Sequence, residues 1–224
     1  MPLIPWRVKN FLSEHFPLMY HVVANLGLRG NSEEHWDARL AETWDAQERH
    51  WPTKNALIAS LARPAESILD VGCGNGAILR HLRKLDYSGL HGLEISRYAI
   101  ERLRAEGIKM HYGALPAISL PDGSFDVVIA SQVLEHIVRR NRFLGEVARV
   151  LRPGGRAFIF VPDNCLGPIA EREHVVKFDR RSLHELLARH FSRVSVESMT
   201  DANHAMPILF AQAAAPLRRT QPDG

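Results

Sequence analysis

Ile68-Leu-Asp-Val-Gly-Cys-Gly-Asn-Gly-Ala-Ile78 is the stretch of sequence that decides the fold. The apolar run up to Val71 is typical of a buried parallel strand, and a helical pattern from Ala77 to Leu85 follows at once. The turn between them contains three glycines, Gly72, Gly74 and Gly76. Glycine tolerates positive φ and leaves no Cβ between the backbone and a ligand. Strand, turn and helix together predict a backbone cradle for a nucleoside-bearing ligand.

Asp70 separates two classes of nucleoside ligand. Gly72-x-Gly74-x-x-Ala77 also satisfies the dinucleotide pattern G-x-G-x-x-G/A, which alone is a weak signal. A carboxylate where the strand enters the turn would repel a pyrophosphate but attract an ammonium group. S-adenosylmethionine carries an ammonium and a sulfonium and has no phosphate. Asp70 therefore favours S-adenosylmethionine over NAD.

A second acidic residue supports a nucleoside without distinguishing these two ligands. Gly89–Ile95 predicts a second strand with Glu94 near its end, and Ser96 is a good N-cap for the next helix. Glu94 follows Asp70 by one strand–helix–strand unit. A carboxylate at this place accepts hydrogen bonds from ribose hydroxyls, which both ligands have.

With two later segments, the chain resembles class I S-adenosylmethionine-dependent methyltransferases of the ubiquinone- and menaquinone-biosynthesis type (type 11). Leu69–Gly76 is similar to motif I, Gly113–Ile137 to the region between motifs II and IV, and Arg149–Arg156 to the connection into the fifth strand. The resemblance covers about residues 66–161. It implies an α/β, Rossmann-like doubly wound sheet of seven strands, the last antiparallel, and S-adenosylmethionine as the cofactor.

The resemblance also assigns the cofactor-binding residues. They are Asp70, Gly72, Cys73, Gly74, Asn75, Gly76, Glu94, Ile95, Ala114, Leu115 and Ser131. The chain departs from the family at one of them, because relatives often carry an acidic residue after Gly113 that binds the adenine amino group, and Ala114 stands here. Backbone groups of Ala114 and Leu115 remain to define an adenine edge.

Two histidines are candidates for the general base that a hydroxyl acceptor would use. His136 follows the predicted fourth strand, Phe125–Ala130. His174 begins a His-x-x-x-Phe pattern, ending at Phe178, that resembles relatives methylating small molecules. We favour His174, since a histidine in the position of His136 is more often a structural hydrogen-bond donor. The histidines form no H-x-x-x-H or Cys/His cluster along the sequence, so no metal is expected.

The sequence divides into three parts: an N-terminal helical segment (1–65), a methyltransferase domain (66–214) and a tail expected to be disordered (215–224). In the domain, five strands alternate with helices up to residue 161. A helix over Ser182–His190 and two strands over 193–199 and 207–213 complete it.

The N-terminal helical segment has two features that allow more than one interpretation. Trp36, Leu40 and Trp44 recur at a spacing of four and predict a helix that packs on the sheet, covers the cofactor as a lid, or does both. Residues 1–30 predict two short amphipathic helices with excess basic charge. They would dock on an anionic membrane surface, or pack within the protein or a dimer, and we favour packing.

Composition narrows the function class. The 224 residues, 46% hydrophobic, suit a globular domain, with no apolar run of ~18 residues that would span a bilayer. The first residues lack a secretory signal, and two cysteines form no disulfide framework, which favours the cytoplasm. A net charge of +3 from scattered lysines and arginines argues against a nucleic-acid substrate.

Taken together, the sequence favours methyl transfer from S-adenosylmethionine to a small-molecule, glycan or lipid-linked acceptor, with oxygen preferred as the acceptor atom. Two alternatives stay open. One is an S-adenosylmethionine-binding module without turnover. The other is a nicotinamide-dependent oxidoreductase, against which Asp70 and Pro121–Ile129 argue. The sequence carries no readable signal for the acceptor or the oligomeric state.

Overall fold

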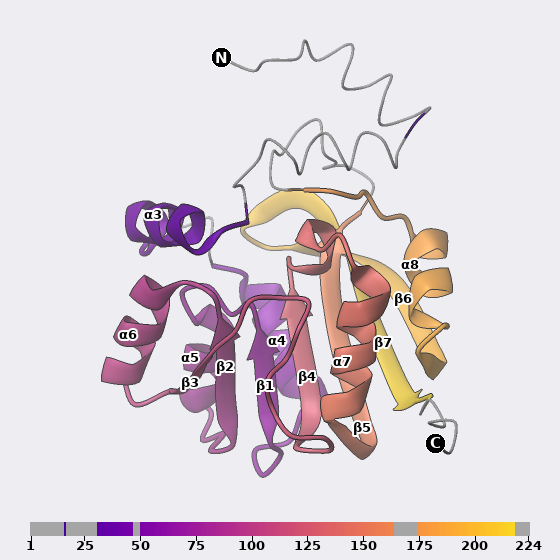
Figure 1. The fold of residues 1–224 in the computed structure, drawn as a ribbon, viewed down its shortest axis with the longest axis horizontal. Coiled ribbons are helices and arrows are strands. Elements are labelled where there is room, and N and C mark those ends of the chain that lie inside the picture. The colour runs from indigo at the N-terminus through magenta and orange to yellow at the C-terminus, as the bar shows by residue number, and fades with distance from the viewer. Residues whose placement is uncertain (1–15, 17–30, 47–49, 164–173, 218–224) are drawn as a thin grey trace, which may run out of the picture.

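The computed structural model describes residues 16, 31–46, 50–163 and 174–217 of the chain. These residues form three layers, in which a seven-stranded sheet lies between helices on both of its faces (Figure 1). The candidate membrane-docking segment, residues 1–30, lies outside the described residues except at Phe16. Within the described ranges, no helix has both the length and the apolar character needed to cross a bilayer.

The strands of the sheet are β1 (Ile68–Val71), β2 (Leu90–Glu94), β3 (Lys109–Tyr112), β4 (Phe125–Ser131), β5 (Leu151–Pro162), β6 (Phe191–Asp201) and β7 (His204–Pro216). Their spatial order is β3-β2-β1-β4-β5-β7-β6. Strands β1 to β5 are parallel, and β7 is antiparallel to β5 and β6. This confirms the doubly wound, Rossmann-like sheet with an antiparallel last strand. The strand order reverses between β1 and β4, where such sheets bind ligands at their carboxyl edge.

The helices are α3 (Glu33–Thr43), α4 (Pro52–Leu61), α5 (Ala77–Arg83), α6 (Arg97–Ala105), α7 (Arg140–Val150), α8 (Arg180–Leu187) and the 3-10 helix η2 (Leu134–His136). Leu69 and Val71 of β1 pack into one core with α7 and α8, whereas Ile68 packs into a second core with α4, α5 and α6. All four β1 residues are buried, because the strand is central and covered on both faces. The position of Asp70 in this strand therefore places a carboxylate in the interior.

The C-terminal elements extend beyond their predicted boundaries. β7 runs through Pro216, which pairs with Phe191 of β6, so the beginning of the tail predicted as disordered (215–224) belongs to the sheet. α8 begins earlier than predicted, because the Asp179 carboxylate accepts a hydrogen bond from the Ser182 backbone N–H (2.7 Å) and caps the helix. Residues 218–224 lie outside the described part of the chain.

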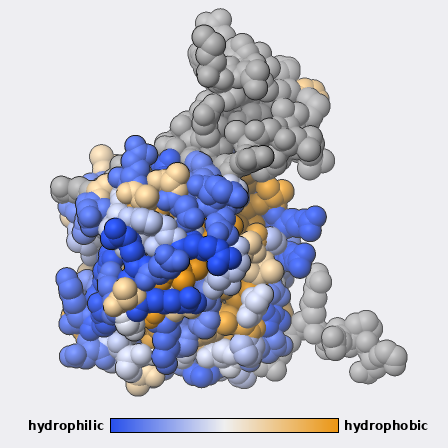
Figure 2. Space-filling model, turned by 60° about the vertical axis from the view of Figure 1, so that its left-hand side comes forward, coloured by the Kyte–Doolittle hydropathy of each residue, from blue (hydrophilic) through white to orange (hydrophobic). Residues whose placement is uncertain are grey.

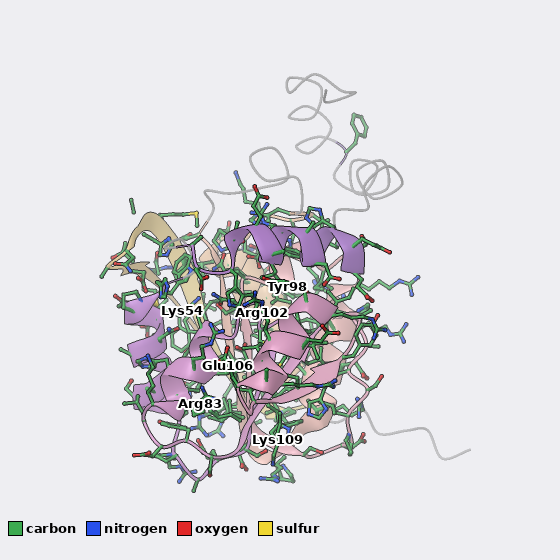
Figure 3. All side chains as sticks on the ribbon, turned by 90° about the vertical axis from the view of Figure 1, so that its left-hand side faces the viewer. Lys54, Arg83, Tyr98, Arg102, Glu106 and Lys109 are labelled. Atoms are coloured by element: carbon green, nitrogen blue, oxygen red, sulfur yellow. The ribbon has the colours of Figure 1, made fainter. Side chains whose placement is uncertain are left out.

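Polar contacts dock α3 onto the start of α6, on a flank whose outer surface is mostly hydrophilic (Figure 2). The Asp37 carboxylate accepts hydrogen bonds from the Ser96 hydroxyl and the Tyr98 backbone N–H (3.1 Å), at a helix N-terminus that favours an anion. Figure 3 shows Tyr98 and Arg102 beneath α3. The Arg102 guanidinium lies 5.3 Å from the centre of the Trp44 ring, which is itself buried. α3 therefore packs onto the domain, as one of the two interpretations predicts.

Candidate active site

A cavity of about 690 Å³ lies at the carboxyl edge of the sheet, beside the neighbouring strands β1 and β4, between which the strand order reverses. The glycine turn, the end of β2, the segment after β4 and helices α3 and α4 supply its walls. The cavity is lined by every predicted cofactor residue except Gly76, namely Asp70, Gly72, Cys73, Gly74, Asn75, Glu94, Ile95, Ala114, Leu115 and Ser131. His136 and His174 line it as well. Residues from distant parts of the sequence thus share one site.

Asp70 is the buried anion of this cavity. It is 1% exposed, and its Oδ2 has no hydrogen-bond partner among the described residues. Burial raises the pKa of Asp70 to about 7, while the Lys54 ammonium opposes this shift and the Glu94 carboxylate adds to it. A buried carboxylate oxygen without a partner is unfavourable by itself, because it loses its hydration. A cationic ligand group in the cavity would supply the missing hydrogen bond.

Glu94 joins the end of β2 to the glycine turn. Its Oε2 accepts a hydrogen bond from the Gly74 backbone N–H (2.8 Å), and its Oε1 accepts from the N–H groups of Ile95 (2.7 Å) and Ser96 (3.1 Å). A carboxylate has about four acceptor sites and can accept from ribose hydroxyls as well as from backbone N–H groups. The backbone bonds hold the carboxylate at the cavity wall before a ligand arrives.

Two of the three glycines are required for packing rather than for clearing space for a ligand. A Cβ on Gly72 would lie 2.7 Å from Cγ2 of Val133, and a Cβ on Gly76 would lie 2.5 Å from Cδ2 of Leu103. Both glycines also have positive φ, +65° and +73°. Gly76 does not line the cavity and packs against Leu103 of α6, so its assignment as a cofactor-binding residue stays a prediction.

Of two further predicted cofactor residues, Asn75 stabilises the turn itself, and Cys73 carries a thiol with a raised pKa. The Asn75 side chain donates to the Trp44 carbonyl (2.9 Å) and accepts from the Ala77 N–H (3.3 Å), so it links α5 to the end of α3. Burial raises the pKa of the Cys73 thiol well above its usual range. The thiol therefore stays protonated at neutral pH, which excludes a thiolate role.

Lys54, labelled in Figure 3, is a site residue that no motif in the sequence marks. It lies on α4, is 4% exposed, and donates from Nζ to the Ser131 hydroxyl (2.7 Å). Burial lowers the pKa of Lys54 to about 8 against the attraction of three carboxylates, those of Asp70, Asp201 and Glu135. A helical lysine is usually solvated, and only the packing of α4 against the sheet reveals this one as a buried cation beside Asp70.

The two predicted catalytic histidines meet in the cavity. Their ring centres are 4.8 Å apart with the planes at 82°, and the Trp36 ring of α3 packs edge-on against His136 at 5.5 Å. The Val175 N–H donates to the Glu135 carbonyl (2.8 Å), which holds the segment carrying His174 against η2. Glu135 lies within this group, is 1% exposed, and was not singled out by the sequence pattern.

The buried charges fit S-adenosylmethionine better than a dinucleotide. Asp70 and Glu94 place two buried carboxylates beside the glycine turn, where a pyrophosphate would have to lie. The same carboxylates complement the ammonium group and the ribose of a phosphate-free nucleoside. Ala114 and Leu115 line the cavity beyond Glu94, where they can define an adenine edge through backbone groups.

Comparisons with known proteins agree with this geometry. A family described as "Methyltransferase domain" matches residues 69–159. The 27-O-demethylrifamycin SV methyltransferase of Amycolatopsis mediterranei is 31% identical over 153 residues, which cover 63% of this chain and 55% of that protein. The O-methyltransferase cnsE of Penicillium expansum is 37% identical over 102 residues, 42% of this chain and 37% of that one.

Solved structures share the fold. In the complex of the Haloferax volcanii Trm112 methyltransferase activator with a methyltransferase, the matched chain is 20% identical to this one, with a TM-score of 0.67. The match covers 84% of this chain and 99% of that one. The chain spans between about a third and about half of the length of the first curated relatives it matches.

Proposed function

Because residues 69–159 form a class I S-adenosylmethionine-dependent methyltransferase domain of the type 11 branch, we propose that this protein methylates a hydroxyl group of a small-molecule, glycan or lipid-linked acceptor. S-adenosylmethionine is the cofactor of this domain. The acceptor class and the acceptor atom are the proposed part. An oxygen acceptor is supported by the printed activities of two relatives and by the imidazole pair in the cavity.

The observation that carries the cofactor part of the proposal is the buried Oδ2 of Asp70, which lies at the wall of the cavity without a partner among the described residues. This oxygen would accept a hydrogen bond from the ammonium of the methionine half. Glu94, already fixed by three backbone N–H groups, would accept from the ribose hydroxyls. When bound, the sulfonium supplies an activated methyl group, so the protein contributes mainly alignment and exclusion of water.

Lys54 completes the methionine subsite in this proposal. The methionine half is a zwitterion, and its carboxylate needs a cation near the acid that holds its ammonium. Lys54 is the buried cation that interacts with Asp70 across the cavity. Its Nζ donates to the Ser131 hydroxyl at the end of β4, which places Ser131 beside this subsite.

The acceptor would enter beside the two histidines. His136 and His174 line the same cavity as Asp70, and Trp36 of α3 closes against His136 from the side. An acceptor hydroxyl placed there would lie next to polar groups that can act on its proton. We expect the first 65 residues and the loop Pro162–Phe178 to shape this end, and of these, residues 1–15, 17–30, 47–49 and 164–173 lie outside the described part of the chain.

Calorimetry and product analysis test the proposal together. We expect the chain to bind S-adenosylmethionine and not NAD, and Asp70→Asn to weaken that binding by about 10- to 100-fold, the value of one charge-assisted hydrogen bond. Asp122→Asn removes an acid that is 77% exposed at its side chain and outside the cavity, and it should bind normally. Incubation with a labelled methyl donor and a cell extract should yield S-adenosylhomocysteine and a labelled ether.

Three outcomes contradict the proposal in different ways. Uptake of NAD in place of S-adenosylmethionine would support the oxidoreductase alternative. Binding without S-adenosylhomocysteine across a broad acceptor panel would support the non-catalytic module. A product labelled on nitrogen or carbon would retain the methyltransferase and remove the oxygen preference.

A further inference from the structure

Glu135 is a buried carboxyl group without a hydrogen-bond partner among the described residues, and burial raises its pKa to about 8 against the attraction of Lys54. It lies in the short helix η2, directly after β4, and is 1% exposed. Neither Oε1 nor Oε2 has a hydrogen-bond partner in the described part of the chain. Its backbone is well held, since its carbonyl accepts from the Val175 N–H. A buried carboxylate of this kind is normally paired with a cation or coordinates a metal.

Two imidazoles stand next to this carboxylate. Glu135, His136 and His174 each offer one ligand atom, and the three atoms lie within 4.8 Å of one another. His174 is 8% exposed, so the group is shielded from bulk water but faces the cavity through both histidines. The sequence separates His174 from the other two residues, and the hydrogen bond from Val175 to Glu135 brings the segments together.

We propose that Glu135, His136 and His174 bind a divalent transition-metal ion. Two imidazole nitrogens and one carboxylate oxygen are a donor set that suits ions such as Zn²⁺, Mn²⁺ or Fe²⁺, whereas Mg²⁺ and Ca²⁺ prefer oxygen ligands. Around an ion with bonds of ~2.1 Å, the donor atoms are about 3–4 Å apart, so small side-chain rotations would close the observed spacing. Three protein ligands leave open positions toward the cavity.

The metal site rests on the proposed methyltransferase function for its chemical role. The ion would bind the acceptor hydroxyl oxygen at an open position and lower the pKa of that hydroxyl. The hydroxyl proton leaves to solvent, the oxygen forms a bond to the methyl carbon, and the carbon–sulfur bond breaks with its electron pair going to sulfur. An ether, S-adenosylhomocysteine and a proton result. His136 and His174 then act as ligands, in contrast to the sequence-based expectation of a histidine base and no metal.

Metal binding can be measured on the full chain without cofactor or acceptor. Metal-free protein would be titrated with Zn²⁺ by calorimetry and with Co²⁺ by visible absorption, which reports the ligand set. We expect one equivalent of ion with the wild-type chain. Glu135→Gln and His174→Asn should each weaken binding by about 100-fold or more, because loss of a ligand costs at least as much as loss of its supporting contacts.

Two matched histidine variants control for adventitious binding. His184→Asn changes an exposed histidine of α8, and His111→Asn changes a second imidazole pair, in which His91 and His111 have ring nitrogens 3.0 Å apart. Both variants should keep the full equivalent of ion. Circular dichroism and S-adenosylmethionine binding confirm that Glu135→Gln and His174→Asn are folded.

The result that overturns the metal site is distinct from the result that overturns the methyltransferase. No stoichiometric Zn²⁺ or Co²⁺ binding by the wild-type chain, or equal binding by Glu135→Gln and His174→Asn, removes the metal and returns the two histidines to the role of proton acceptors. If His111→Asn no longer binds one equivalent of metal ion, the ion binds at the pair His91 and His111, and the proposal is also overturned. Failure to bind S-adenosylmethionine removes the methyl transfer, whatever the metal titration shows.

Discussion

At the residue scale, the site depends on a carboxylate kept away from water. Asp70 follows two apolar residues in a strand whose four members are all buried, so the backbone carries the side chain inside whether or not a ligand is present. Its pKa of about 7 means that the ligand-free protein holds Asp70 partly protonated near neutral pH. A cationic ligand selects the ionised form.

This pKa predicts how cofactor affinity depends on pH. The Asp70 carboxyl is raised by burial, so its ionised fraction falls about tenfold for each pH unit below about 7. The affinity for S-adenosylmethionine should therefore decrease as the pH is lowered from 7.5 to ~5.5, by up to about 10-fold per unit. Calorimetric titrations at several pH values measure this. In Asp70→Asn the acid side of the profile should be flat, and an unchanged slope in that variant would assign the dependence to another group.

The residues that the sequence identified differ from those it missed in how local their signals are. Asp70 and Glu94 were predicted because each ends a recognisable strand next to a turn or a cap. Lys54 and Glu135 could not be predicted as residues of the site, because a lysine on a helix and a glutamate after a strand are usually solvated. Their roles arise from tertiary packing, which buries both and places them near the same cavity.

At the scale of elements, the junction between β1 and α5 explains the glycine pattern. Gly76 is the N-cap of α5 in the left-handed region, and its missing Cβ lets Leu103 of α6 pack against the turn. This contact joins α5, α6 and the cofactor turn into one unit. The glycine is therefore needed for the shape of the cradle, although it does not line the cavity.

Substitution at this junction separates steric from conformational effects. Gly76→Ala should lower the free energy of unfolding by about 2–6 kcal/mol, because a left-handed conformation and overpacking each cost about 1–3 kcal/mol. Gly107→Ala is the matched control, since Gly107 has φ +80° but nothing within 4 Å of an added Cβ. Gly107→Ala should lower the free energy of unfolding only by the cost of the left-handed backbone conformation, about 1 kcal/mol. Urea denaturation measures both, and equal losses would show that Leu103 does not constrain the turn.

The positions of strands could be predicted where an apolar run ends at residues that favour a turn or a helix N-cap. β1, β2 and β4 match their predicted segments closely. The third strand, β3, received no predicted bounds, because its four residues include only one fully buried side chain, Met110. β6 and β7 exceed their predicted lengths, since the two strands pair with each other beyond the segments from which each was predicted.

At the scale of the whole molecule, the edge of the sheet opposite the cavity is held by an ion-pair group. Glu66, just before β1, accepts hydrogen bonds from Arg156 of β5 (2.9 Å) and from Arg63 (2.8 Å to its backbone N–H). Arg156 also donates to the Leu61 carbonyl at the end of α4 (2.7 Å). These bonds connect α4, β1 and β5 away from the site, so the helix that carries Lys54 is anchored at its far end.

Glu66→Gln should destabilise the whole domain in a pH-dependent way. Hydrogen bonds from Arg156 and Arg63 outweigh burial and lower the pKa of Glu66 to about 2. A lowered carboxyl pKa gives stability that is complete above the unfolded value of about 4.5 and is lost as the pH falls toward 2. We expect a loss of about 2 kcal/mol at pH 7. Chemical denaturation should show this loss shrinking below pH 4.5, and a constant difference would exclude the ion pair as its cause.

The overall architecture was predictable because it follows from strand order and connection rules rather than from particular contacts. Alternating strands and helices over 66–161 require parallel pairing with helices on both faces, and the resemblance supplied the antiparallel last strand. The composition of the acceptor end was not predictable. It combines residues from α3, α4, η2 and the segment after β5, whose spacing along the chain carries no pattern.

The segment that matches the methyltransferase family ends before His174 and begins after Trp36 and Lys54. The matched part of the chain contains Asp70, Glu94 and the glycine turn, while the flanking parts add Trp36, Lys54 and His174 to the wall of the same cavity. In the proposed methyltransferase, replacing these flanks would change the cavity wall beside His136 and leave Asp70, Glu94 and the glycine turn in place. Grafting the flanks of one relative onto the core of another is the corresponding route for an engineer.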